Sequence, residues 1–514
     1  MTDKSSYLPP SLMSKLLRAS YWLRDFFMPE RPEKFFLHWF LLVGILLCFI
    51  LPPFMGPDEA SHTYRAYEFS TGDVVLDKYD KGYGAPIPDT LIKLNSDQFW
   101  QNSKQQPGVA RGYNMQIGGI NAPHKTVQYF ENTSVYSPLA YIHFIIVMWF
   151  DRLVNLPVYY GFILLRLANI AVYAALVYWA IRIAPKKRWF LVMAGLLPMA
   201  VHQASVVSPD GFINGAALLA IACVGKMLSD KKFPGYKLLA LLTTMVFIVG
   251  FSKQAYVFFP LFLFILPASL FLRQKFSKRT YVAGTVGLVV VGLALWSLAT
   301  ATVSANAFNV WRDRDAFGAT PTTSQFIKTT LKEPVTSAEV LARSFVYNIG
   351  YQGPLPSSPE SLTTNLPANF TLTSFLGQFG SLLINYPVWM YFVVVAGLVV
   401  PLMGDKEKYL LSSRMRLLVA ATIALVFITL TLVFWLKWTP SGGPYIIGLQ
   451  GRYLIPLVGL LAFLPSGKFA KLQLQPGILP KILVAIVAIE GVMMLGLITA
   501  QYYEFPNFRS IFLP

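Results

Sequence analysis

Long apolar stretches recur along the whole chain and are separated by short polar segments that contain lysine and arginine. Stretches near 20 residues are what a helix needs to cross a bilayer, where it satisfies its own backbone hydrogen bonds. The pattern therefore predicts an all-α integral membrane protein with about eleven transmembrane helices. They are expected at residues 35–54, 160–182, 189–207, 210–228, 237–252, 256–272, 280–301, 386–403, 415–436, 453–466 and 481–500.

The composition supports this class and narrows the partners. Apolar residues make up 55% of the 514 positions and charged residues only 13%, which excludes an ordinary soluble protein. The formal net charge of +18 would suit nucleic acid, but the basic residues form small clusters between apolar stretches, as orientation signals do. We therefore expect a lipid bilayer and no nucleic acid as partner. Cys48 and Cys223 lie inside apolar stretches, so neither a disulfide nor a cysteine metal site is predicted.

The positions of lysine and arginine also predict which side of the membrane each loop faces, because cytoplasmic loops carry more of them. Residues 1–34 contain six basic residues and are expected to form a cytoplasmic N-terminus with an amphipathic helix on the inner leaflet. The first apolar stretch ends at Pro52-Pro53 without a small-residue cleavage site, so it is interpreted as an anchor rather than a signal peptide. Every predicted inner loop then contains a basic cluster.

One further apolar segment, residues 136–150, could be counted as an additional transmembrane helix. Treating it as a crossing would put the basic cluster at residues 186–188 outside and invert every later loop. The segment is short for a crossing, and Asp151-Arg152 follows it at once. It is therefore predicted to be an interfacial helix that does not cross the membrane.

The resulting organisation has two large outer segments. Loops of such length are usually functional rather than connective, and the chain shows no internal repeat of the kind found in inverted-repeat transporters. The predicted parts are a cytoplasmic N-terminus (1–34), a transmembrane module (35–301) with an outer loop at 55–159, a second outer loop (302–385), and C-terminal transmembrane helices (386–514).

Four polar clusters fall at predicted outer ends of spans, where charged groups are costly and usually functional. They contain Asp58, Glu59, His62 and Arg65; Asp210; Lys253 and Tyr256; and Gln450, Arg452 and Tyr453. Because these clusters are distant in sequence but share one boundary of the membrane, we expect them to form a single site at the end of the helix bundle.

Each cluster also has a purely structural interpretation. Asp58 and Asp210 fit helix N-caps, Lys253 can extend to the interface, Arg452 can act as an outer anchor, and the tyrosines are typical of interface belts. Asp58 and His62 have the i, i+4 spacing of metal ligands. No further ligand accompanies them, so no metal site is predicted and a need for a divalent metal is doubtful.

A carboxylate beside paired cations suits a particular chemistry. The carboxylate can act as a general base toward a hydroxyl group, while Lys253 and Arg452 can bind a phosphate. A phosphate at the bilayer edge with an aliphatic tail in the lipid describes a polyprenyl-phosphate. Such a carrier would bring a sugar to the outer face, and the cations would stabilise the phosphate as it leaves.

At these positions the chain resembles a family of bacterial polytopic membrane proteins known only as a domain of unknown function, which looks like a branch of the GT-C class of glycosyltransferases. The resemblance implies a GT-C-like bundle with interfacial helices in the first outer loop, a catalytic aspartate at Asp58, polyprenyl-phosphate sugar donors and inversion at the sugar. One departure is that Asp-x-Asp metal pairs are absent, since Asp210 stands alone. The matching stretches are Pro57-Asp58-Glu59-x-x-His62-x-x-Arg65, Tyr136-x-Pro138-Leu139, Ser208-Pro209-Asp210, Lys253-x-x-Tyr256 and Gln450-Gly451-Arg452-Tyr453.

The sequence thus predicts a glycosyltransferase of the bacterial cytoplasmic membrane whose site faces outward. It would transfer a sugar from a polyprenyl-phosphate donor to a hydroxyl of a cell-envelope glycan or lipid-linked glycan, as in O-antigen modification, without a cofactor. Alternatives are a flippase or transporter of lipid-linked sugars, and a polymerase or ligase of lipid-linked glycans. The expected roles are Asp58 as the catalytic base, with Glu59 as the alternative base or in support; Lys253, Arg452, Tyr256 and Tyr453 at the donor phosphate; and His62, Arg65, Asp210 and Gln450 orienting the substrates.

Overall fold

A computed structural model describes most of the chain. It covers residues 26–102, 117–304, 323–346, 370–405, 407–439, 446, 448–465 and 477–503. Most of the amphipathic N-terminus predicted at 1–34, and much of the predicted outer loop 302–385, lie outside the described residues. Within them the protein is mostly helical.

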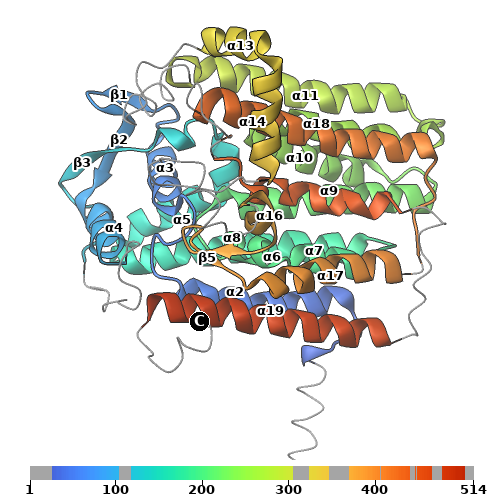
Figure 1. Ribbon diagram of the computed structural model, residues 1–514, viewed down its shortest axis with the longest axis horizontal. Helices are drawn as coiled ribbons and strands as arrows, with labels where there is room; N and C mark the ends of the chain where they lie inside the picture. The colour runs from blue at the N-terminus through green and yellow to red at the C-terminus, as the bar shows by residue number, and fades with distance from the viewer. Residues whose placement is uncertain are drawn as a thin grey trace, which may run out of the picture.

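Six helices in the described part of the chain are long and apolar enough to cross a membrane. They lie side by side in Figure 1 and form one bundle. Helix α9 is buried along almost its whole length and therefore lies at the centre. The six are α2 (Pro32–Ile50), α6 (Val158–Ile183), α9 (Pro209–Asp230), α11 (Lys278–Ala299), α18 (Ser413–Trp438) and α19 (Ile478–Tyr502).

The other five predicted spans form shorter or broken helices. They are α7 (Arg188–Gly195) with α8 (Pro198–Ala204), α10 (Tyr236–Ser252), η3 (Gln254–Ile265) with η4 (Ala268–Phe271), α17 (Val388–Gly404) and η5 (Gly451–Phe463). The break before α8 falls at Pro198, because proline disfavours helical backbone in the residue before it. Each of the eleven apolar stretches is thus helical, but only six candidate spans are established, and the count of about eleven stays a prediction.

Two of these segments, η3 and η5, are long 3₁₀-helices rather than α-helices. Each contains an internal proline, Pro260 or Pro456, which removes a backbone N–H that an α-helix would use. Runs of this kind longer than three or four residues are uncommon. Both begin beside residues of the predicted site, since η3 follows Lys253 and η5 contains Arg452 near its start.

Large apolar side chains cover the outside of the bundle. On α11, Leu295 and Leu298 are more than half exposed, and on α17 the same holds for Val388 and Phe392. A soluble monomer rarely leaves a contiguous apolar surface of this size open to water. The exposed faces therefore suit lipid contact, in agreement with the predicted class.

A compact unit at one end of the bundle is formed by residues of the first predicted outer loop (Figure 1). Its elements are α3 (Glu59–Thr71), β1 (Asp77–Tyr79), β2 (Gly82–Pro88), α4 (Asp89–Asn102), β3 (Lys125–Tyr129), η1 (Glu131–Thr133), η2 (Pro138–Tyr141) and α5 (Ile142–Val154). The strands form an antiparallel sheet in the order β1-β2-β3, with Gly84 paired with Tyr129. A Cβ at position 84 would stand 1.7 Å from the Gln128 carbonyl oxygen, so only glycine fits there. This small sheet was not predicted.

The segment predicted not to cross the membrane, residues 136–150, comprises η2 and most of helix α5. The 13 residues of α5 span about 20 Å, which is short of the hydrocarbon core of about 30 Å. Ile146, Trp149 and Phe150 are more than half exposed, whereas the Trp149 indole N–H donates a hydrogen bond of 3.0 Å to the carbonyl of Ser70 in α3. Together with η2, which precedes it directly, α5 extends about 28 Å, so whether this segment lies in the interface or crosses the bilayer stays a prediction.

A second group of elements packs against the same end of the bundle. It comprises α16 (Phe370–Leu376) and a hairpin of β4 (Gln378–Phe379) and β5 (Ile384–Asn385). Helix α13 (Thr323–Lys332) lies at the top of the view in Figure 1, and α14 (Pro334–Val346) runs down from it. The backbone N–H of Gly451 donates to Ser374 Oγ at 2.8 Å. A Cβ on Gly451 would stand 1.8 Å from the Thr371 carbonyl oxygen. Helix α16 therefore fixes the start of η5.

Candidate active site

The site is built on a strained turn that follows helix α2. Pro52 and Pro53 prevent α2 from continuing, and the backbone then adopts left-handed conformations at Phe54 (φ 63°) and Asp58 (φ 55°). Such conformations are uncommon for residues other than glycine and cluster at functional sites. Asp58 occupies the N-cap position of α3, but its side chain makes no capping hydrogen bond. Its carboxylate is free for other contacts.

The turn is held in place by Arg166, which lies on α6. Its guanidinium binds both carboxylate oxygens of Glu59, at 2.8 and 2.7 Å. It also donates to the carbonyl oxygens of Cys48, Leu51 and Pro52 at 2.9, 2.6 and 2.9 Å. The side chains of Arg166 and Glu59 are both 0% exposed. This pair therefore ties the end of α2 to the start of α3.

Asp58 points away from its neighbour and forms an ion pair with Arg452. Arg452 Nη2 lies 2.6 Å from Asp58 Oδ2, and the Asn132 amide donates to Oδ1 at 3.4 Å. The Asp58 side chain is 39% exposed, whereas that of Arg452 is 1% exposed. Arg452 Nε donates to Gln450 Oε1. The site thus presents an accessible carboxylate backed by a buried cation.

A second ion pair lies behind the first. Ser208 caps α9 and accepts from the Asp210 N–H at 3.3 Å, so the Asp210 carboxylate is not needed as a cap. It accepts instead from Lys253 Nζ at 2.7 Å and from Gln203 Nε2 at 2.7 Å. Gln203 Oε1 in turn accepts from Asn214 Nδ2 at 3.0 Å. Ser208 rather than the Asp210 side chain is therefore the cap of α9, and the Lys253 ammonium is paired inside the protein.

Aromatic rings enclose the lysine of this second pair. Lys253 Nζ lies 4.2 Å from the ring centre of Tyr453 and 4.9 Å from that of Tyr136, distances at which the ring faces attract a cation. Only 9% of its side chain is exposed. The Tyr256 hydroxyl donates to the Tyr453 carbonyl at 2.8 Å, which joins the starts of η3 and η5.

The two pairs connect into one charged chain. Arg452 Nη1 lies 3.8 Å from Asp210 Oδ2, beyond hydrogen-bonding distance, and among the described residues this buried nitrogen has no hydrogen-bond partner. The order is Asp58, Arg452, Asp210, Lys253, with two carboxylates balancing two cations. Burying such groups gains little stability, because desolvation offsets their attraction. A function is the better explanation for placing them here.

Protonation follows from these neighbours. Burial acts to raise the pKa of Asp58, but Arg452 and His62 outweigh it and hold the pKa below its usual 3.8. Burial lowers the pKa of His62 to about 4, against the opposing effect of Asp58. His62 Nδ1 lies 2.6 Å from the hydroxyl of Tyr141. At neutral pH, Asp58 is therefore ionised and His62 is uncharged.

Most of the predicted site residues are brought together, and two are not. The cluster contains Asp58, His62, Asp210, Lys253, Tyr256, Gln450, Arg452 and Tyr453. Glu59 is bound to Arg166 instead. Arg65 pairs with Glu68, donates to the Val74 carbonyl at 3.0 Å and stacks 4.0 Å from the Phe69 ring centre. These two residues stabilise the turn and α3 and do not face the cluster.

Sequence reasoning missed the residues that position the site. Arg166 lies within an apolar stretch, and such a charge is itself a signal of function. Asn169 follows on the same face of α6, and its amide donates to the carbonyls of Gln203, Val206 and Ser208 at 3.1, 2.8 and 3.1 Å. Tyr136 was present in a matching stretch but was not selected.

The described residues contain no group of three histidine, cysteine, aspartate or glutamate side chains able to hold a metal ion. His62 is buried and uncharged beside Asp58. The group next to these two side chains is a cation, Arg452, and not a further metal ligand. A guanidinium at this distance disfavours a divalent cation. The expectation about a metal stays a prediction.

The helical bundle, its apolar surface and the charged cluster at one end define a multi-pass membrane protein. More particularly, the chain belongs to the family described as "Predicted membrane protein (DUF2142)", whose profile matches residues 41–461. No curated protein and no solved structure matches it. The predicted resemblance to a membrane protein family of unknown function is confirmed, while the likeness to GT-C glycosyltransferases stays a prediction.

Proposed function

We propose that this protein is a membrane glycosyltransferase that moves a sugar from a polyprenyl-phosphate to a hydroxyl group of an envelope glycan. The observation that carries the proposal is the ion pair of Asp58 with Arg452. Its carboxylate is accessible, its cation is buried, and a second cation lies behind it. On the orientation predicted from the basic loops, the site faces the non-cytoplasmic side of the bacterial inner membrane.

Arg452 is the proposed binding site of the donor phosphate. Its Nη1 has no hydrogen-bond partner within the part of the chain that the structure describes, and a guanidinium binds phosphate oxygens through two parallel donors. Lys253 adds a second positive charge within the same cluster. Tyr453 and Tyr136 surround that lysine and would exclude water from the phosphate.

The proposed step is a displacement at the anomeric carbon of the sugar. The acceptor hydroxyl oxygen forms a bond to this carbon, and its proton passes to Asp58. The bond between the anomeric carbon and the phosphate oxygen breaks, and the polyprenyl-phosphate leaves with the electron pair. Arg452 and Lys253 stabilise the charge that develops on it. Attack opposite the leaving group inverts the anomeric configuration.

The Asp58–Arg452 pair also couples binding to chemistry. With Arg452 beside it, Asp58 has a lowered pKa and is a weak base. A phosphate that takes over the guanidinium would reduce this effect, so the basicity of Asp58 would rise when the donor is in place. In the free enzyme Asp58 would therefore be a weaker base than in the complex with the donor.

The remaining residues support this arrangement. Asp210 holds Lys253 and faces Arg452, while Gln450 orients the guanidinium. The hairpin β4–β5 contacts the strained turn through Ser381 Oγ, which donates to the Met55 carbonyl at 3.4 Å. Segment 370–385 would therefore help to enclose the acceptor.

A transporter of lipid-linked sugars is the second candidate, and the helix breaks favour it. Transporters bind substrate where spans are discontinuous, and here α7–α8, η3 and η5 are broken or irregular and begin or end near the charged cluster. A transporter needs cations for the phosphate but no carboxylate base. The role of Asp58 therefore separates the two candidates.

The decisive experiment uses the full chain in sealed liposomes with a synthetic polyprenyl-phosphate sugar and candidate acceptors. For Asp58→Asn we expect sugar transfer to fall by about 10²-fold or more, the usual effect of losing a general base. Donor binding should be kept or strengthened, because Arg452 is released. Mass spectrometry of the products and a donor-binding titration measure the two quantities.

Asp73→Asn, at an exposed aspartate beyond α3, is the matched control and should leave both quantities unchanged. Full transfer by the Asp58→Asn variant would remove Asp58 from the role of base. Movement of the donor across the bilayer without any new glycosidic bond would instead establish the transporter.

A further inference from the structure

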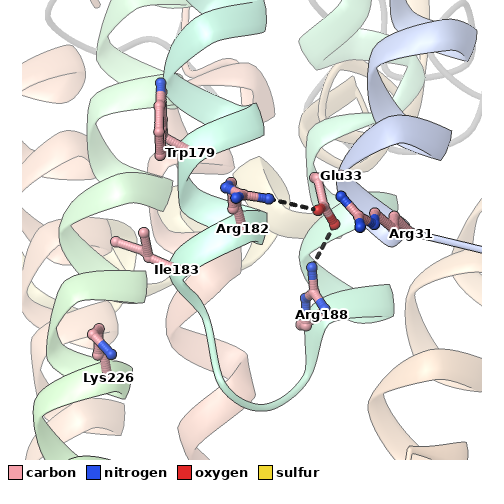
Figure 2. A pocket seen from close by; sticks show the side chains of 7 residues that line it. All are labelled: Arg31, Glu33, Trp179, Arg182, Ile183, Arg188 and Lys226. Carbon is pink, nitrogen blue, oxygen red and sulfur yellow. Dashed lines mark hydrogen bonds and ion pairs between the residues drawn. The ribbon is translucent and has the colours of Figure 1, made fainter.

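A basic hollow lies beside the first turn of α2, the end of this helix that is remote from Asp58. Figure 2 shows the side chains that line it. Its volume is about 480 Å³. Glu33 is in the first turn of α2, whose other end leads to Asp58, and the 19 residues of α2 span about 28 Å. The side chains that matter for its chemistry are Arg31, Glu33, Trp179, Arg182, Arg188 and Lys226.

The hollow carries an excess of positive charge. Glu33 is 3% exposed and pairs with two arginines, with Arg182 Nη1 at 3.4 Å from Oε1 and Arg188 Nη2 bound to Oε2. Figure 2 shows this carboxylate between the two guanidinium groups, with Arg31 beside it. One carboxylate thus neutralises only part of three arginines. Lys226, the fourth cation of the hollow, is paired with Asp230 at 2.9 Å, so the excess charge belongs to the arginines.

The cations remain available to a ligand. The side chain of Arg182 is 45% exposed and that of Arg188 is 33% exposed. Glu33 fixes the orientation of both guanidinium groups without covering them. Two guanidinium groups held in fixed orientations in this way can donate hydrogen bonds to the oxygens of a phosphate.

Apolar groups form the adjoining wall. Trp179 is 53% exposed and lies one turn before Arg182 and Ile183 on α6 (Figure 2). Tryptophan is enriched where a membrane meets water. A ligand in the hollow would therefore meet charged and apolar surfaces together, as a lipid does and a free phosphate ion does not.

We propose that this hollow binds the phosphate of an acidic phospholipid headgroup. Basic pockets between transmembrane helices on the cytoplasmic side recognise such headgroups, and the loop charges predict that this end of the bundle is cytoplasmic. Arg31, Arg182 and Arg188 contact the phosphate, while Trp179 and Ile183 contact the glycerol and the first part of the acyl chains. The bound lipid joins the ends of α2, α6 and α7. This inference does not depend on the proposed glycosyltransferase activity.

Native mass spectrometry of the full chain in detergent tests the proposal, with dioleoyl phosphatidylglycerol and dioleoyl phosphatidylcholine as probes. Wild-type protein should retain phosphatidylglycerol in preference to phosphatidylcholine. Arg31→Gln should weaken phosphatidylglycerol binding about fivefold, since a basic side chain near anionic lipid contributes about 1 kcal/mol. Adding Arg182→Gln should weaken it about fivefold again.

Arg31→Gln leaves both ion pairs of Glu33 intact, so its effect is separable from misfolding. The matched control is Arg273→Gln with Arg279→Gln, which removes two exposed charges from another predicted inner loop and should leave lipid binding unchanged. Equal losses in the control and the hollow variants would overturn the proposal. Wild-type binding of both lipids with equal affinity, or full displacement of phosphatidylglycerol by inorganic phosphate, would also overturn it.

Discussion

Asp58 and Glu59 are adjacent carboxylates with opposite surroundings. Glu59 is sealed in the protein with Arg166, and every oxygen of its carboxylate accepts hydrogen bonds, including those from the N–H groups of Gly56 and Val207 at 2.9 and 2.8 Å. Asp58 is open on one side and shares its arginine with a second carboxylate. The left-handed backbone at Asp58 turns the two side chains apart. One pair stabilises the turn, and the other is available for chemistry.

The sealed pair should show the largest effect on folding. Arg166→Met leaves Glu59 charged and buried without its partner, and breaking a buried pair in this way costs about 3–5 kcal/mol. We expect a strong fall in the unfolding temperature and in the monodisperse fraction in detergent. Asp58→Asn is the control and should change the unfolding temperature little, because its side chain is partly exposed. Equal unfolding temperatures for Arg166→Met and the wild type would contradict the division between the two pairs.

His62, beside Asp58, should make the stability of the folded state fall at low pH. Its pKa is about 4 in the protein, against 6.5 ordinarily, so below 6.5 the unfolded chain binds a proton that the folded chain does not. Stability contributed by neutral His62 is therefore complete above pH 6.5 and is lost as the pH falls to 4, by about 3 kcal/mol.

The measurement compares denaturant unfolding of the wild type and His62→Gln at several pH values between 7 and 4. The wild type should lose more stability than the variant over this range. The difference between the two proteins excludes the contributions of other buried histidines, because both proteins contain them. Asp58 adds nothing in this window, because its lowered pKa places its own loss of stability below pH 3.8. Parallel curves for the two proteins would show that His62 titrates normally.

The smallest expected effect concerns the two parallel donors of the Arg452 guanidinium. Arg452→Lys keeps the charge beside Asp58 but replaces two parallel donors by a point charge. We expect donor binding to weaken roughly tenfold, equivalent to about 1.4 kcal/mol, with little change in unfolding temperature. Arg273→Lys, at an exposed site, provides the comparison. If donor affinity were the same in both variants, the phosphate would not be bound by the guanidinium.

The apolar stretches allowed the helical segments to be located, because lipid-facing helices must be apolar along their length. Strand β1 has only three residues, and β2 contains two glycines and two prolines, so neither shows the pattern that predicts a strand. The charged clusters at Asp58, Asp210, Lys253 and Arg452 were also found, because charges at the end of an apolar stretch stand out.

The division of labour within the first cluster could not be predicted. Asp58 and Glu59 have the same chemistry and neighbouring positions, and only the backbone conformation at Asp58 separates them. The partner of Glu59 lies 107 residues away inside an apolar stretch, so no local pattern joins the two. Long-range pairing, rather than residue type, decides which carboxylate is structural.

The two long 3₁₀-helices change how the dimensions of this bundle should be judged. A 3₁₀-helix rises about 2.0 Å per residue and an α-helix about 1.5 Å. The 13 residues of η5 therefore extend about 26 Å, where an α-helix of equal length would extend about 20 Å. A tally of crossings by residue number undercounts such segments, and extent in ångströms is the quantity to set against the thickness of the lipid.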